Sequence, residues 1–268
     1  MKNIEDLSLS TTVFSKENKE DDLLYYLETV RNAGFNYVEL SRKHFNLANR
    51  VQAIYDTGIK VWSIHGCLSS HAISDDKTLR RQAIDQEITR IHEAAAFGKV
   101  PVVEHYLDRK NDPRYGKYFR EAIEELYEVS HQLGVILTVE TVPYKPLINE
   151  RYPSSMEIAD FVRSFRADDL LMTIDINHSN LNELLPDVCK NCDGLIANVH
   201  MSNNNGLWED HLPPDKGVID FHETFTALRK HGYHGPANLE IHGEEMVTVE
   251  YLREIYEYTQ NILWGEKQ

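Results

Sequence analysis

Four short apolar segments in the second half of the chain each end on a residue that binds metals well. The segments VILTVET, LLMTIDINH, LIANVHMS and ANLEIHG supply, in that order, Glu140, Asp175, His200 and Glu240. Oxygen and imidazole donors without thiolates suit a divalent ion such as Mn, Mg, Co or Zn, and three carboxylates balance its charge. The pattern therefore predicts one divalent metal ion held by these four side chains.

Three histidines take similar positions in the sequence. His65 and His105 end two earlier apolar segments, and His178 follows Asp175 in D-x-x-H spacing. Any one of them alone is typical of a structural histidine with ordinary hydrogen bonds. Because all three fall at the ends of apolar segments, we expect them beside the metal, where their side chains would contact substrate.

A polar loop follows the third of the four ligand-bearing segments. Its sequence, HMSNNNGLWEDHLPPDKGVIDF at residues 200–221, places Glu209 and His211 just before two consecutive prolines, which stiffen the backbone. We expect Glu209 and His211 to contact substrate as well. Trp208 is a candidate apolar wall against one face of that substrate.

These positions require a fold that brings the ends of many strands together. Apolar runs alternate with stretches of helical periodicity along the whole chain, which favours β/α units. Because the first polar residue after a buried parallel strand faces the mouth of a β/α barrel, eight such units predict a single-domain (β/α)8 TIM barrel over residues 1–268. The expected strands are residues 7–14, 37–41, 60–65, 100–106, 135–141, 170–176, 195–202 and 237–241.

The rival fold is a doubly wound open sheet. A nucleotide-binding version of that fold carries a glycine-rich turn after its first strand. The segment after Phe14 reads SKENKEDD and has none of these glycines. The closed barrel is therefore the better prediction.

Composition limits the expected partners and compartment. A formal net charge of −15 over 268 residues argues against binding to nucleic acid, because such affinity comes largely from Lys and Arg. The apolar stretches are too short to cross a bilayer, and the acidic start MKNIEDLSLS is unlike a signal peptide. Three cysteines do not make a disulfide framework. We expect a cytoplasmic enzyme with a small substrate, no nucleic acid and no membrane.

One segment departs from this acidic character. Arg109, Lys110, Arg114 and Lys117 lie among tyrosines directly after the expected strand at 100–106. Two interpretations stay open, namely a clamp for a substrate phosphate and a solvated charged surface.

In its motifs the chain resembles the xylose isomerase-like TIM barrel superfamily, which contains sugar isomerases and epimerases together with endonuclease IV. The resemblance covers nearly the whole chain. It implies a metal-dependent isomerase or epimerase that acts on a sugar, a sugar phosphate or a keto-polyol, with His178 in contact with the substrate. The motifs that carry it are Glu140-Thr141, D-x-x-H at 175–178, the loop at 200–221 and Leu239-Glu240-Ile241.

The resemblance also implies how such an enzyme works. A metal that chelates a ketose carbonyl and the neighbouring hydroxyl makes the adjoining C–H acidic enough to form an enediolate. Glu140 and Glu240 would be the catalytic pair that removes and returns the proton. Return to the opposite face gives an epimer, and return to the neighbouring carbon gives an isomer.

Two alternatives stay open at this point. One is an endonuclease IV-like phosphodiesterase with three zinc ions, which acts on abasic DNA and would add zinc at His65, His105, His178, Glu209 and His211; Glu209 stands where that family has Asp. The other is a metal-dependent barrel lyase or dehydratase. The charge of −15 favours sugar chemistry over DNA. The sequence does not decide between a monomer and a homodimer or homotetramer.

Overall fold

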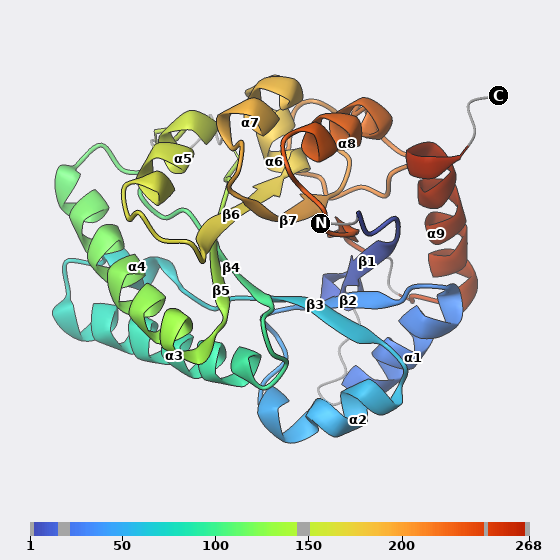
Figure 1. Cartoon of the computed structure of the whole chain (residues 1–268), viewed down its shortest axis with the longest axis horizontal. Helices are drawn as coiled ribbons and strands as arrows, with labels where there is room; N and C mark the ends of the chain where they lie inside the picture. Colours follow the sequence, from blue (N-terminus) through green and yellow to red (C-terminus); the bar gives the residue numbers. More distant parts are fainter. Residues whose placement is uncertain (1–2, 16–21, 144–150, 244–245, 266–268) are drawn as a thin grey trace.

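The strands form a closed parallel barrel. A computed structural model of the chain describes residues 3–15, 22–143, 151–243 and 246–265. Neighbouring strands pair in sequence order, and β1 closes the ring by pairing with β8 (Figure 1). The predicted (β/α)8 barrel is therefore confirmed. The strands are β1 (Leu7–Ser10), β2 (Tyr37–Leu40), β3 (Lys60–His65), β4 (Pro101–His105), β5 (Ile136–Glu140), β6 (Leu170–Asp175), β7 (Ile196–Met201) and β8 (Ala237–Leu239).

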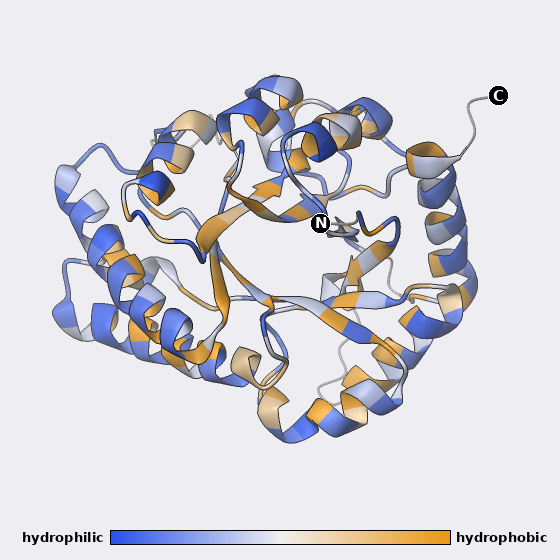
Figure 2. Ribbon diagram, in the orientation of Figure 1, coloured by the Kyte–Doolittle hydropathy of each residue, from blue (hydrophilic) through white to orange (hydrophobic). Residues whose placement is uncertain are grey.

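Helices surround the strands (Figure 1). They present hydrophilic residues to the outside and apolar residues to the barrel, as the alternation of colours in Figure 2 shows. None of the helices in the described ranges combines the length and apolarity that a membrane crossing needs. The helices are α1 (Leu23–Ala33), α2 (Val51–Asp56), α3 (Lys77–Ala95), α4 (Pro113–Leu133), α5 (Ser155–Arg163), α6 (Ile176–Asn180), α7 (Leu185–Asn191), α8 (Phe221–Lys230) and α9 (Val249–Trp264).

Local sequence explains where these helices start and stop. The Asp112 side chain accepts a hydrogen bond from the Arg114 N–H and caps α4, while Pro113 takes the first helical position. Gly134 ends α4 in the left-handed conformation, with φ of 72°, and β5 begins two residues later. Such tight connections keep each helix packed on the strands beside it.

The barrel interior is unusually polar. The Thr138 and Thr173 hydroxyls of adjacent strands lie 2.7 Å apart, and both side chains are fully buried. Fully buried Glu39 on β2 is hydrogen-bonded to His200 on β7, a contact that crosses the interior. Apolar packing is concentrated instead between strands and helices, where Phe119 and Leu126 of α4 join the hydrophobic core.

The third strand ends as predicted, whereas the other seven end earlier than predicted, and two of these ends have a clear local cause. The first strand stops at Ser10 rather than at residue 14, because the Ser10 side chain accepts from the Thr12 N–H and starts a 3-10 helix at Thr11–Phe14. The sixth stops at Asp175, which caps α6 in the same way, so His178 lies on a helix. The extent of the domain over all of residues 1–268 stays a prediction.

Candidate metal centre and active site

The four predicted ligands meet at the carboxyl ends of consecutive strands. One donor atom from each of Glu140, Asp175, His200 and Glu240 lies within 4.8 Å of all the others, and all four residues are buried. His200 Nδ1 is 2.8 Å from Glu140 Oε1 and 3.0 Å from Glu240 Oε2. Strands β5 and β6 end on Glu140 and Asp175, His200 is the penultimate residue of β7, and Glu240 follows β8 directly.

The charges in this cluster are strongly coupled. Burial alone would raise the pKa of Glu140, but His200 and His105 beside it hold that pKa well below its usual range. Burial likewise lowers the pKa of His200, yet Glu240, Glu39 and Glu140 together raise it well above normal. The His200 imidazole therefore supplies part of the positive charge that offsets the three carboxylates.

The histidine does not fully offset the negative charge of the cluster, as Asp175 shows. Its Oδ1 accepts the His178 backbone N–H at 2.8 Å, while its buried Oδ2 has no hydrogen-bond partner among the described residues. Burial and the neighbouring Glu140 raise the pKa of Asp175 to about 8. An oxygen that has no hydrogen bond and lies among other carboxylates fits a divalent cation, since a hard cation takes oxygen ligands and offsets their charge.

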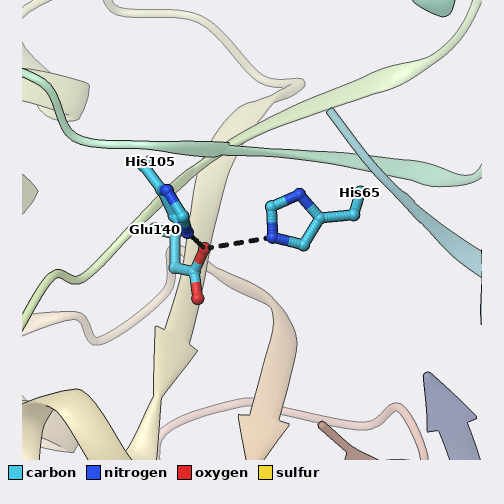
Figure 3. A group of neighbouring side chains, drawn as sticks. All are labelled: His65, His105 and Glu140. Atoms are coloured by element: carbon cyan, nitrogen blue, oxygen red, sulfur yellow. Dashed lines mark ion pairs between the residues drawn. The ribbon is translucent and has the colours of Figure 1, made fainter. Parts of the chain in front are cut away.

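Two more groups of metal-binding side chains adjoin the first. His65 and His105 approach Glu140 from β3 and β4, with Nε2 atoms 4.0 and 3.1 Å from Glu140 Oε2 (Figure 3). Burial lowers the pKa of His65. For His105 the effect of burial is outweighed by Glu140, so its pKa is raised. The structure thus places both histidines next to the centre, as predicted.

The second adjoining group comes from α6 and the loop between β7 and α8. His178 donates from Nδ1 to the Thr141 carbonyl at 2.9 Å, so its Nε2 is left as an acceptor, and this atom lies 3.4 Å from Glu209 Oε2. Burial lowers the pKa of His178, which keeps the ring neutral. His211 adopts a left-handed backbone with φ of 48° and completes the group. A non-glycine residue held in this conformation is often found at functional sites.

A cavity of about 330 Å³ opens above these groups. Its volume suits a small ligand, and its walls combine polar and apolar side chains. The fully buried Glu140, Asp175 and His200 lie below its lining, whereas Glu240 contributes to it. The lining residues are Thr12, Arg42, His65, His105, Tyr106, Leu107, Arg109, Val142, Pro143, His178, Glu209, His211, Glu240 and His242.

Comparison with known proteins identifies the fold family. The sequence profile of the xylose isomerase-like TIM barrel family matches residues 27–264. The chain belongs to this family. The resemblance inferred from the motifs is therefore confirmed.

Relatives within this family are named as sugar epimerases. The chain is 28% identical over 243 residues to an L-ribulose-5-phosphate 3-epimerase of Escherichia coli O1:K1, and the match covers 81% of each chain. The crystal structure of a D-tagatose 3-epimerase-like protein superposes with a TM-score of 0.81 at 17% identity, covering 96% of each chain. An L-ribulose 3-epimerase superposes with a TM-score of 0.74 at 20% identity, covering 98% of this chain and 87% of that one. These relatives confirm the prediction that the chain is an enzyme.

The structure separates the basic residues of the 109–117 segment of this family member. Arg109 lines the cavity and donates to the Pro143 carbonyl at 2.8 Å. Arg114 instead pairs with Asp112 and Asp75 on the surface. The phosphate-clamp interpretation therefore stays open for Arg109. The solvated-surface interpretation fits Arg114 and also Lys117, which is exposed and pairs with Glu121.

One predicted residue and one unpredicted residue complete the site. Trp208 is 47% exposed on its loop and does not belong to the cavity lining, so its contact with substrate stays a prediction. Glu39 was not predicted, although it contacts His200 from β2. The signal was present, because a charged residue within the apolar run Tyr37–Leu40 has to be buried with a partner.

Proposed function

We propose that the protein is a divalent-metal-dependent sugar or sugar phosphate epimerase that transfers a proton through an enediolate. The observation that carries the proposal is the cluster of Glu140, Asp175, His200 and Glu240 at the cavity floor, in which one buried Asp175 oxygen has no hydrogen bond among the described residues. The relatives named as 3-epimerases support epimerisation over isomerisation. Related barrels that catalyse isomerisation, dehydration or bond cleavage stay as the alternatives.

The four clustered side chains would hold one divalent ion, whether Mn, Mg, Co or Zn. When bound, such an ion polarises the carbonyl and an adjacent hydroxyl of a ketose and so makes the neighbouring C–H easier to break. Burial of the carboxylates strengthens their interaction with the ion because little water competes.

Glu140 and Glu240 are the proposed acid and base. One carboxylate takes the proton from the carbon next to the carbonyl, and the C–H electron pair moves to form the C=C of the enediolate as the carbonyl oxygen gains charge. The other, in its protonated form, returns a proton to the opposite face of that carbon. The carbonyl then re-forms, and the product is the epimer.

Other residues of the lining would bind and orient the sugar. The Nε2 of His178 can accept a hydrogen bond from a sugar hydroxyl, since its Nδ1 is committed to the Thr141 carbonyl. His65, His105, Glu209 and His211 offer further polar contacts in the same cavity. Arg42 and Arg109 line the cavity as well and suit the phosphate of a sugar phosphate.

The adjoining side-chain groups favour a second candidate function. His65 and His105 with Glu140, and His178 and His211 with Glu209, could each hold an additional zinc ion. Three metals would fit an endonuclease IV-like phosphodiesterase that cuts abasic DNA. The net charge of −15 weighs against a DNA substrate.

Metal analysis followed by an exchange assay tests the proposal. Protein purified without chelator or a metal-binding tag should contain about one divalent ion per chain. In D2O with Mn²⁺, it should introduce deuterium into L-ribulose 5-phosphate or a free ketose and form the epimer, as followed by NMR. Chelator should stop both events and Mn²⁺ should restore them.

Other results would separate the alternatives. About three zinc ions per chain, with cleavage of an abasic-site oligonucleotide and no deuterium exchange, would replace the proposal with the phosphodiesterase. Exchange with loss of water from the sugar would indicate a dehydratase. A cytoplasmic location and assembly as a homodimer or homotetramer stay predictions.

A further inference from the structure

Glu39 occupies the barrel interior beneath the metal centre. Its side chain is fully buried and does not belong to the cavity lining. Its Oε2 accepts three hydrogen bonds, from Ser63 Oγ at 2.7 Å, His200 Nε2 at 2.8 Å and Asn238 Nδ2 at 3.0 Å. These donors come from β3, β7 and β8, so a single carboxylate oxygen joins four strands inside the barrel.

The two nitrogens of His200 face different groups. Nδ1 points into the predicted metal centre, 2.8 Å from Glu140 and 3.0 Å from Glu240. Nε2 points away from that centre to Glu39. A carboxylate on one ring nitrogen keeps the proton there, which leaves the lone pair of the other nitrogen available to a metal and makes that nitrogen a stronger donor.

Glu39 has a basic partner in His200, but one imidazole does not balance the charge of Glu39 and three further carboxylates. Glu39 adds a fourth negative group to the three carboxylates that already surround His200. Like charges that are buried together destabilise a fold unless a cation offsets them. A neutral side chain of the same shape would keep the packing and remove this repulsion, so the charge itself needs a reason.

We propose that Glu39 is a positioning residue of the metal centre, which holds the His200 ring with Nε2 protonated and Nδ1 directed at the metal. The inference rests on the proposed function, because it takes the metal to be bound by Glu140, Asp175, His200 and Glu240. Glu39 itself touches neither metal nor substrate. Its effect reaches the reaction through the orientation and basicity of one ligand.

The substitution Glu39→Gln tests the role of the charge. Glutamine keeps the length and one oxygen acceptor for the His200 N–H. Its amide N–H can donate to Asn238 Oδ1, which is buried and has no hydrogen-bond partner among the described residues. Glu39→Ala removes both the charge and the acceptor. Glu87→Gln is the matched control, because Glu87 is an equally buried glutamate that lies on α3 and contacts none of the four ligands.

The first measurement is calorimetric titration of the chelator-treated full chain with Mn²⁺. We expect Glu39→Gln to weaken Mn²⁺ binding about 10-fold and Glu39→Ala to weaken it by up to about 100-fold. Glu87→Gln should bind as the wild type does. Thermal unfolding without metal should show Glu39→Gln at least as stable as the wild type, since one buried negative charge is gone.

The second measurement is nitrogen-15 NMR of the His200 ring in the zinc-loaded wild type. The expected signature is a protonated Nε2 and a metal-bound Nδ1. A proton on Nδ1, or Mn²⁺ affinities of both Glu39 variants within about twofold of the wild type, would overturn the inference. Equal losses of affinity and of metal-free stability in both variants would assign Glu39 a merely structural role and overturn it as well.

Failure of the proposed function gives a different pattern. If the wild type binds no divalent metal at the four ligands, the proposed function itself is wrong. If the wild type binds metal and catalyses exchange while Glu39→Gln does so with unchanged affinity, only the inference about Glu39 is wrong.

Discussion

Two groups of buried carboxylates lie close together in this molecule and differ in what surrounds them. The inner group is the proposed metal centre inside the barrel, which consists of Glu140, Asp175, His200 and Glu240. The outer group lies between the barrel and α3 and consists of Glu87, Glu104, Arg90 and Cys67, of which the two glutamates and Arg90 are at most 2% exposed. Both groups place glutamates where water is excluded.

The outer group lowers its own negative charge. Burial, and then the neighbouring Glu87, raise the pKa of Glu104 well above normal, which favours its protonated form and an interaction between the two carboxyl groups. Glu87 and Glu104 also accept backbone N–H groups of Cys67 and Leu68. A Cβ on Gly66 would overlap the Glu104 carboxyl group, so this close packing needs glycine there.

Arg90 extends the outer group to the loops that border the cavity. Its guanidinium donates to the carbonyls of Arg42 and His44 after β2 and contacts the Cys67 sulfur after β3. The inner group, by contrast, gathers three carboxylates around His200 and meets the cavity through Glu240, whereas the outer group does not belong to the cavity lining. Burial of carboxylates is therefore common to both groups, and the difference is that the inner group opens to a cavity that can admit a ligand.

The strongest test of this comparison is Glu240→Gln. It removes a charge from the metal centre and a proton-transfer group, so we expect kcat for sugar epimerisation to fall by about 10³-fold or more. Glu140→Gln should lower kcat to a similar extent. Circular dichroism should show an intact fold for both. If either variant turns over at the wild-type rate, the substituted glutamate is not the acid or base of the reaction.

A smaller effect is expected for His178→Ala. Its Nε2 faces the cavity but the residue is not one of the four ligands, so we expect KM to rise by roughly 10-fold, the loss of one buried hydrogen bond to substrate. The Mn²⁺ dissociation constant should change much less than KM. Steady-state kinetics and metal titration on the same preparation check this, and a larger loss of metal than of substrate binding would contradict it.

His44, whose carbonyl accepts from Arg90 of the outer group, should give stability a pH dependence. Burial, and then Arg90, lower the pKa of His44 from 6.5 to about 4. The unfolded chain binds a proton at His44 more readily than the folded chain does. The contribution of neutral His44 to the free energy of unfolding is therefore complete above pH 6.5 and is lost as the pH falls from 6.5 to about 4. Across that window the loss amounts to about 2 to 3 kcal/mol, at about 1.4 kcal/mol per pKa unit.

Urea unfolding of the wild type and His44→Gln at several pH values, with chelator present, isolates this contribution. The difference in unfolding free energy between the two should decrease as the medium becomes more acidic. Parallel curves from neutral to acidic pH would show that His44 has an ordinary pKa in the folded protein.

The smallest effect is expected for Glu104→Gln. Because the raised pKa of Glu104 favours its neutral form, glutamine matches its shape and charge, and the unfolding free energy should change by less than about 1 kcal/mol. Metal affinity should not change. The same Glu→Gln substitution would thus be tolerated in the outer group and abolish function in the inner one. A loss of Mn²⁺ binding in Glu104→Gln would show that the outer group also contributes to metal binding, which contradicts the comparison.

Much of the site could be predicted from the sequence because parallel strands impose a simple rule. The residue at the carboxyl end of each barrel strand faces the same opening, so Glu140, Asp175 and His200 could be assigned to one site from local patterns alone. The alternation of apolar runs and helical periodicity determined the barrel for the same reason. His65 and His105 followed from their positions at strand ends.

Only the tertiary structure decided the contacts that depend on distant segments. Glu39 joins His200 across 161 residues of sequence, and no local pattern relates β2 to β7 in the barrel interior. The interaction between Glu87 and Glu104 likewise depends on where α3 lies relative to β4. Strand ends and ligand types are local properties of a chain, whereas the partner of a buried charge is set by which strands the closed barrel brings face to face.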